Sequence, residues 1–197
     1  MHRLLLATVA VVALSGAAQA GMFNTAQITQ APGILQSATI NQTNTDFSSS
    51  RIRQVGVLQS ANSVQRGAFN RQRTTQIGAL QFADTDQDGV FNRSRTTQVG
   101  IGQLSLTEQD GAFNRSRTTQ VGAGQLSVTD QDGIFNRSQT TQVGVGQLSV
   151  TDQNGAFNRA QTTQVGAGQV AVTTQNGVGN TSAISQVGVG QVAIIQQ

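Results

Sequence analysis

The stretch that decides the fold reads Gln87-Asp-Gly-Val-Phe-Asn92-Arg-Ser-Arg-Thr-Thr-Gln98-Val-Gly-Ile-Gly-Gln103-Leu-Ser-Leu-Thr-Glu-Gln109, and close copies of it recur from Gln54 to Gln197. A glutamine returns every eleven residues, a glycine follows two residues after it, and an amide follows five residues after it. The second amide alternates between glutamine and asparagine, so the true period is 22 residues. A repeat of this length predicts a stacked array of similar units rather than a globular domain.

Each eleven-residue unit divides into a turn and a strand. The strand part alternates with a period of two, and a glycine at every eleventh position excludes a continuous helix. We therefore predict an all-β fold, a β-solenoid of 22-residue rungs with two strands and two turns each, and cross-β stacking about 4.8 Å apart. Residues 54–197 would hold six full rungs and a half rung.

Two sets of residues are the candidate structural sites of the repeat. A glycine in each turn implies a backbone angle or a close approach that a Cβ would obstruct. These turn glycines are Gly56, Gly67, Gly78, Gly89, Gly100, Gly111, Gly122, Gly133, Gly144, Gly155, Gly166, Gly177 and Gly188. The predicted self-assembly ladder consists of Gln54, Gln65, Gln76, Gln87, Asn92, Gln98, Gln109, Asn114, Gln120, Gln131, Asn136, Gln142, Gln153, Asn158, Gln164, Gln175, Asn180 and Gln186.

The alternation within each strand predicts which side chains face inward. We place Asn92, Ser94, Thr96 and Gln98 of one strand inside the rung, and Gln103, Ser105, Thr107 and Gln109 of the other. Both eleven-residue halves of the repeat share this pattern, while the positions between these residues differ. In such a core each amide would hydrogen-bond the same amide one rung above and below. Arginines and a stripe of Leu and Val would then face outward. The opposite phase, with Leu and Val inside, would satisfy ordinary core logic on one sheet and stays open.

Composition excludes several kinds of chemistry. The chain has no cysteine, and His2 is its single histidine. Thiolate sites, histidine-dependent catalysis and His-ligated metals are therefore not expected, and we predict no enzyme activity, no metal and no cofactor. The net charge of +3, which falls to +2 without Arg3, is too weak to predict nucleic acid as the main partner.

The N-terminal 53 residues differ from the repeat. Residues 1–20 read as a secretory signal peptide, with Arg3, an apolar run and a small-residue cleavage site at Ala18-Gln19-Ala20. Residues 21–53 carry a degenerate repeat in which Gln30, Gln42 and Gln54 are twelve residues apart. We interpret this segment as an atypical terminal rung.

One acidic run resembles a calcium-binding loop. Asp84, Asp86, Asp88 and Gly89 are spaced as at the start of an EF-hand, but the twelfth position, where a bidentate glutamate belongs, is Arg95. Later copies also lose the first ligand. We interpret the match as a by-product of the repeat, and predict no metal site here.

The pattern Gln87-x-Gly89-x-x-Asn92-x-Ser94-x3-Gln98 resembles the curlin repeat of bacterial curli. The resemblance implies that the repeat Gln and Asn residues form stacked ladders. It also implies a secreted structural subunit that self-assembles into extracellular amyloid fibres on the cell surface, for biofilm matrix and adhesion. Its partners would be further copies of itself, a second curlin subunit, and a dedicated outer-membrane secretion pore with accessory chaperones.

The resemblance covers about residues 24–197, nearly the whole chain after the predicted signal peptide, with departures. Alternate strands have glutamine where the family has asparagine, as at Gln103 and Gln125. The uniform eleven-residue spacing resembles the nucleator subunit of the family, whereas the near-identical repeats resemble the major fibre subunit. Which of the two subunits the chain corresponds to stays open.

A soluble monomeric β-solenoid with a surface-binding face, of the ice-binding or adhesin type, is the alternative function. Such a monomer needs a polar cap that blunts its exposed edge. The C-terminal sequence Val192-Ala-Ile194-Ile195-Gln-Gln197 is apolar and uncharged, which favours the fibre subunit.

Overall fold

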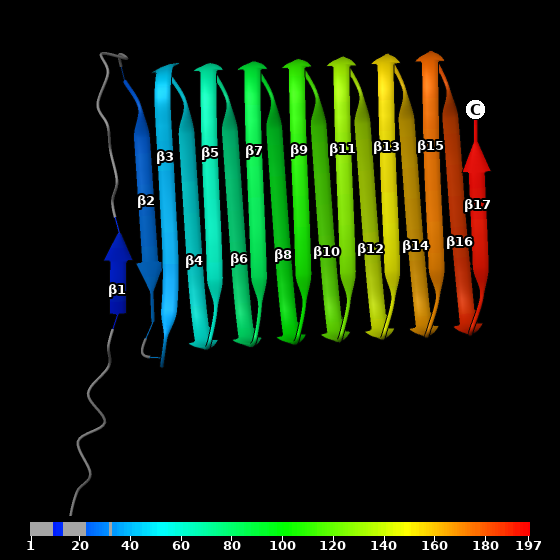
Figure 1. The fold of residues 1–197 in the computed structure, drawn as a ribbon, viewed down its shortest axis with the longest axis horizontal. Helices are drawn as coiled ribbons and strands as arrows, with labels where there is room; N and C mark the ends of the chain where they lie inside the picture. Colours follow the sequence, from blue (N-terminus) through cyan, green and yellow to red (C-terminus); the bar gives the residue numbers. More distant parts are fainter. Residues whose placement is uncertain (1–9, 14–22, 32) are drawn as a thin grey trace, which may run out of the picture.

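The computed structural model describes residues 10–13, 23–31 and 33–197, which form seventeen strands in two parallel sheets (Figure 1). The odd sheet contains β1 (Ala10–Ala13), β3 (Gln36–Asp46), β5 (Ser60–Ala68), β7 (Phe82–Val90), β9 (Leu104–Ala112), β11 (Leu126–Ile134), β13 (Leu148–Ala156), β15 (Val170–Val178) and β17 (Val192–Gln196). The even sheet contains β2 (Thr25–Gln30), β4 (Ser49–Val57), β6 (Arg71–Ala79), β8 (Arg93–Ile101), β10 (Arg115–Ala123), β12 (Arg137–Val145), β14 (Arg159–Ala167) and β16 (Thr181–Val189).

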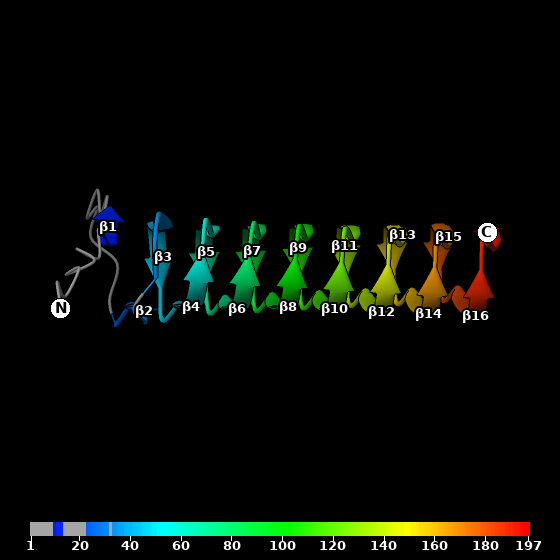
Figure 2. The same ribbon diagram turned by 90° about the horizontal axis from the view of Figure 1, so that it is seen from below.

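The predicted β-solenoid of 22-residue rungs is confirmed. Successive strands alternate between the two sheets, and each strand pairs in parallel with its equivalent in the next rung, as Arg115 pairs with Arg137 and Leu104 with Leu126. The view in Figure 2 shows the odd and even strands as two separate layers. The rungs run from β2/β3 to β16/β17. No helix in the described part of the chain is long and apolar enough to cross a membrane.

The degenerate N-terminal segment forms the first rung and absorbs two extra residues. Gln30 pairs with Gln54 and Gln42 pairs with Gln65, which are separations of 24 and 23 positions along the chain. The regular spacing of the repeat holds from the pair of Thr45 and Gly67 onward, after a register shift between Thr43 and Thr45. One extra residue therefore lies between Gln30 and Gln36, and the other is a bulge at Asn44, whose φ is 52°.

Most of the predicted signal peptide lies outside the described residues. Its residues Ala10–Ala13 form β1, which pairs in parallel with Gln36–Thr39 at the edge of β3. The prediction of a signal peptide stays a prediction.

The interior is polar, as the alternation predicted. Asn92, Ser94, Thr96 and Gln98 are at most 2 % exposed, and later repeats bury the same positions. The opposite phase is wrong, because the outward Leu and Val side chains of the odd sheet are only half-buried against one another, as at Leu104. A small apolar cluster of Ala38, Ile40, Ile52 and Ala61 lies in the first rungs. The rest of the core consists mainly of Gln, Ser and Thr.

The turn glycines stack on one another. All thirteen have φ between +88° and +139°, a region that side chains with a Cβ rarely adopt. At Gly122 (φ +133°) an added Cβ would collide with the carbonyl oxygen of Gly144 in the next rung. A side chain there would force neighbouring rungs apart and break the parallel pairing.

We expect Gly122→Ala to destabilise the folded chain by at least about 3 kcal/mol, because it combines backbone strain with a backbone collision. Gly124→Ala is the matched control, because φ is +59° there and the nearest atom to an added Cβ would be Gly146 N, 3.9 Å away. Strain alone should cost it about 1 kcal/mol. Urea midpoints measure both, and equal losses would contradict the stacking contact.

Candidate functional site

The candidate site is the set of buried amides that joins the rungs. The first column contains Gln30, Gln54, Gln76, Gln98, Gln120, Gln142, Gln164 and Gln186. Each Nε2 donates to the Oε1 of the next member, over 2.8–3.0 Å. From Gln54 onward each Nε2 also donates to a carbonyl of the odd sheet, as Gln120 does to Leu104 O at 3.0 Å. This column therefore joins successive rungs and the two sheets.

A second column was missing from the predicted ladder. It contains Gln36, Gln59, Gln81, Gln103, Gln125, Gln147, Gln169 and Gln191, linked over 3.0–3.3 Å. Each Nε2 from Gln59 to Gln169 also donates to the carbonyl four residues before it, as Gln103 does to Val99 O at 3.1 Å. These glutamines thus close the turn they follow. Their 22-residue spacing was the signal that could have identified them.

The third column contains Gln42, Gln65, Gln87, Gln109, Gln131, Gln153, Gln175 and Gln197, linked over 2.7–3.1 Å. The amides of Gln109 and Gln131 gain bonds to the backbone when their oxygen and nitrogen are exchanged. This column therefore supports the pairing of rungs but not a direction along the axis.

The asparagines correct one expectation. Amide-to-amide bonding holds for the glutamine columns but is wrong for Asn70, Asn92, Asn114, Asn136, Asn158 and Asn180. The backbone N–H of each later asparagine donates to the Oδ1 of the earlier one, over 3.0–3.1 Å. Because the shorter side chain sits at a turn, its Nδ2 bonds turn carbonyls instead, as Asn92 does to Asp88 O at 2.8 Å and Gly111 O at 3.1 Å.

The buried hydroxyls contribute little to this network. Sixteen buried Ser and Thr oxygens in the described residues, including those of Ser94, Ser116 and Ser138, have no hydrogen-bond partner. Alanine takes the same inward position in other rungs, as Ala160 does opposite Ser138. The glutamines therefore make the specific contacts of the core, and the hydroxyl residues fill space between them.

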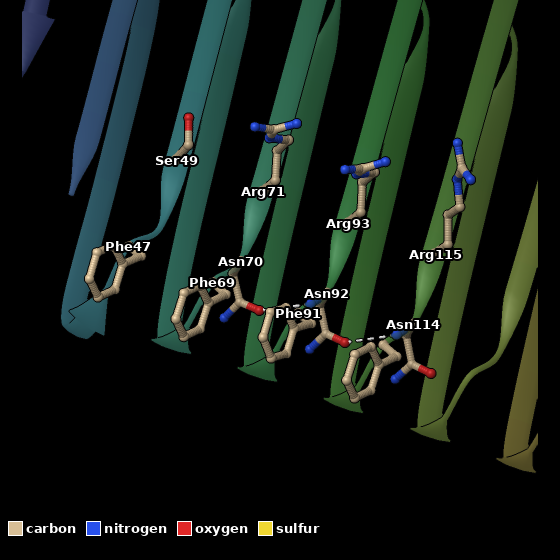
Figure 3. Close-up of a pocket in the computed structure, with 11 residues that line it drawn as sticks. Phe47, Ser49, Phe69, Asn70, Arg71, Phe91, Asn92, Arg93, Asn114 and Arg115 are labelled. Carbon is tan, nitrogen blue, oxygen red and sulfur yellow. Dashed lines mark hydrogen bonds between the residues drawn. The ribbon is translucent and has the colours of Figure 1, made fainter. Parts of the chain in front are cut away.

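A phenylalanine ladder along one corner was also missed. Phe23, Phe47, Phe69, Phe91, Phe113, Phe135 and Phe157 stack with ring centroids 4.7–5.2 Å apart. All have φ between 54° and 60°, which is uncommon for a bulky residue. Figure 3 shows the rings side by side beneath a row of arginines, with a groove between them. The return of phenylalanine every 22 residues from Phe47 to Phe157 was the signal in the sequence.

The acidic residues line the outer face of the odd sheet. Asp130 lies between Glu108 and Asp152 of the neighbouring rungs. Partial burial, and then the charges of Glu108, Asp152, Asp132 and Asp110, raise the pKa of Asp130 above its ordinary value. Asp84, Asp86 and Asp88 lie on the same sheet in β7, and no group of three metal-binding side chains is present among the described residues.

The two ends of the solenoid differ in their free hydrogen-bonding groups. At the N-terminal end, Gln30 Oε1 is buried and has no partner among the described residues. At the C-terminal end, Gln186 Nε2 donates to Val170 O at 3.1 Å but to no further glutamine in the described chain. The first glutamine column therefore ends in an acceptor on one side and a donor on the other.

No family model, curated protein or solved structure matches the chain.

We expect Gln142→Ala to lower the free energy of unfolding by about 2–4 kcal/mol, because it leaves Gln120 Nε2 and Gln164 Oε1 without their partners. Ser138→Ala, on the same strand and similarly buried, removes an unpaired hydroxyl and should cost less than about 1 kcal/mol. Denaturant midpoints compare the two. A loss as large for Ser138→Ala would show that packing, not amide bonding, stabilises the core.

The acidic column predicts a pH dependence. Because the Asp130 carboxyl holds its proton more tightly in the folded chain than in the unfolded chain, its charge destabilises the fold at neutral pH. Asp130→Asn should therefore raise the urea midpoint at pH 7. The gain should fade as the pH falls through the raised pKa to the unfolded value near 3.9. A lower midpoint for Asp130→Asn at pH 7 would contradict this.

Proposed function

We propose that the chain is a secreted structural subunit that polymerises head to tail into extracellular cross-β fibres of the curli type, for biofilm matrix and adhesion. The observation that carries the proposal is the complementarity of the two ends. Both sheets end at the C-terminus in strand edges that are unpaired among the described residues, and the first glutamine column ends there in a donor, Gln186 Nε2, that matches the acceptor Gln30 Oε1 at the N-terminal end.

The join would continue the pairing already present within the chain. β16 would pair with β2 of the next copy, and β17 with β3 of the next copy. Gln186 Nε2 would donate to Gln30 Oε1 of the next copy, which is the buried acceptor without a partner among the described residues. Asn180 Oδ1 would accept the backbone N–H of Asn24, since Asn24 already occupies the asparagine position of the first rung.

Direction follows from the same groups. Two C-terminal ends would present Gln186 Nε2 donors to each other, and two N-terminal ends would present Gln30 Oε1 acceptors. Either arrangement leaves buried amide groups unpaired, at about 1–3 kcal/mol each. Growth with one polarity satisfies both groups.

β1 occupies the strand edge at which fibre growth would take place, so its removal would decide when growth begins. It pairs in parallel along Gln36–Thr39 of β3, the edge that a preceding copy's β17 would use. Loss of the predicted signal peptide would remove β1 and free this edge. Its present pairing supports the proposal, because it is a case of β3 accepting one more parallel strand.

The C-terminal end also favours association. The side chains of Val187, Val189, Val192 and Ile194 are 66–81 % exposed. Val165, which pairs with Val187 one rung earlier, is 39 % exposed. Residues 164–197 carry no charged side chain. A flat, apolar and unpaired edge is a template for another chain. A monomeric solenoid with a binding face would need this edge covered, and the described residues provide no cover.

We expect Ile194→Pro in the chain without residues 1–20 to act as a chain terminator. In parallel pairing, alternate residues bond to opposite neighbours. The backbone N–H and C=O of Gln197 both bond to β15. Ile194 is three residues before Gln197, so its N–H points away from β15, toward the free edge. Proline there removes no bond of the folded chain, yet blocks the next copy.

The measurement is seeded growth followed by thioflavin fluorescence, with fibre diffraction of the wild-type product. Wild type should give the two cross-β reflections, one for the spacing of strands at about 4.8 Å and one for the spacing of sheets at about 10 Å. A substoichiometric amount of the Ile194→Pro chain should stop elongation by wild-type chains at one end of each seed. The urea midpoint of the variant itself should equal that of wild type. The proposal fails if wild type stays monomeric, or if the variant elongates as wild type does.

A further inference from the structure

The charged residues are sorted by sheet. The nine acids all lie on odd strands: Asp46, Asp84, Asp86, Asp88, Glu108, Asp110, Asp130, Asp132 and Asp152. Ten of the eleven described arginines lie on even strands: Arg51, Arg53, Arg71, Arg73, Arg93, Arg95, Arg115, Arg117, Arg137 and Arg159. Arg66 is the exception. One broad face of the solenoid is therefore cationic and the opposite face anionic.

The two faces do not neutralise each other within the chain. Among the acids from Asp84 to Asp152, Asp86 and Asp88 lie within ion-pair distance of a described arginine, and that arginine is Arg66 of the same sheet, at 3.2 and 3.9 Å. The arginines of the even sheet point outward and are exposed. Each face thus presents like charges that repeat about every 4.8 Å.

The charges of both faces lie toward the same edge. Phe113 marks the corner between β9 and β10: Asp110 precedes it and Arg115 follows it. At the other edge, Leu104 begins β9, and its carbonyl accepts from Gln120 near the end of β10. The outward neighbour of Gln120 is Val121. Acids therefore lie opposite arginines at the phenylalanine corner, and apolar side chains lie opposite apolar side chains at the far corner.

The numbers of charges on the two faces also match in the rungs from β8/β9 to β12/β13, whereas the rung β4/β5 has Arg51, Arg53 and Arg66 and no acid. The rung β6/β7 has two arginines outside and three acids, β8/β9 and β10/β11 have two of each, and β12/β13 has one of each. Beyond β14, which carries Arg159, neither sheet is charged. A copy displaced perpendicular to the sheets, in the same orientation, would meet opposite charges in each rung from β6/β7 to β12/β13.

We propose that the cationic face of one copy docks on the anionic face of a second copy in the same orientation, so that solenoids stack side by side through their broad faces. The contact pairs Arg95 and Arg117 of one copy with Glu108 and Asp130 of the other, and Val and Thr columns with Leu and Val columns. Because the two patches differ, the contact is heterologous and does not close on itself. It rests on the proposed function and extends it, since it bundles neighbouring fibres.

Docking relieves repulsion on both faces. Within the acidic face each carboxylate lies near other carboxylates, as Asp130 does, and within the cationic face each arginine lies near other arginines. An opposing column with the same rung spacing places an opposite charge near every member. Many weak pairs on one rigid surface then act together.

A linear polyanion is the competing occupant of the arginine face. It would use Arg95 and Arg117 but leave Glu108 and Asp130 unused. Substitutions on the acidic face therefore separate the two cases, because they disrupt docking between copies and favour a polyanion.

The test is a charge swap in the chain without residues 1–20. The cationic-face variant carries Arg95→Glu and Arg117→Glu, the anionic-face variant carries Glu108→Arg and Asp130→Arg, and a third carries all four. Bundle width by electron microscopy and sedimentation of unpolymerised chains report docking. Seeded elongation reports growth at the ends, so failure of one proposal is distinguishable from failure of the other.

Each two-site variant should lose side-by-side association by roughly tenfold or more, because several pairs turn repulsive at once. Mixing the two variants, or combining all four changes, should restore it, while elongation stays near wild type. About 0.5 M NaCl should weaken wild-type bundling, since the Debye length falls to about 4 Å. The proposal is overturned if fibres of the anionic-face variant bundle as wild type does, or if fibres of the four-site variant do not bundle. It is also overturned if wild-type fibres bundle only when polyphosphate is added.

Discussion

The hydrogen bond between one buried glutamine and its equivalent in the next rung is the interaction on which the structure depends. A core of Ser, Thr and Gln offers little apolar surface, so burial alone would not fix its arrangement. The amide of Gln98 hydrogen-bonds its equivalents in the two neighbouring rungs, Gln76 and Gln120, and also the carbonyl of Phe82. A slip of one residue would turn every such amide outward. The network therefore specifies register as well as contributing stability.

The turns serve the same register by different means. At Gly122 the backbone of the next rung comes so close that a Cβ has no room. At the phenylalanine corner the backbone adopts a left-handed conformation at Phe113, and stacking on Phe91 and Phe135 at 4.9 and 4.7 Å offsets the strain. At the opposite corner Leu35, Leu58 and Leu80 have this conformation in the first rungs, and Gly102 and later glycines take their place in the following rungs.

How much the sequence predicts depends on whether a feature is periodic. Strands, rungs, turn glycines and the inward face follow from spacing alone, because one face of a strand repeats every second residue. The Gln103 column was placed inside by its spacing but left out of the predicted ladder, and the equally periodic Phe113 ladder was missed, since a pattern shows recurrence and not the contact that results. The bonding of Asn92 depends on side-chain length at a turn, and the bulge at Asn44 depends on where two extra residues fit. Neither follows from spacing.

The distribution of charge along the chain connects the two proposed contacts. From the rung β6/β7 onward the number of charges per rung never rises, and it falls from the five outward charges of Arg71 and Arg73 with Asp84, Asp86 and Asp88 to none after Arg159. Stacking at an end brings like columns within about 4.8 Å, where repulsion between unit charges is on the order of 1 kcal/mol in water. An uncharged last rung avoids that repulsion at the growing edge. Docking between broad faces requires the opposite, a dense array of charge, and the middle rungs provide it. The same repeat unit thus accommodates both contacts by varying its outward residues while its amide core stays constant.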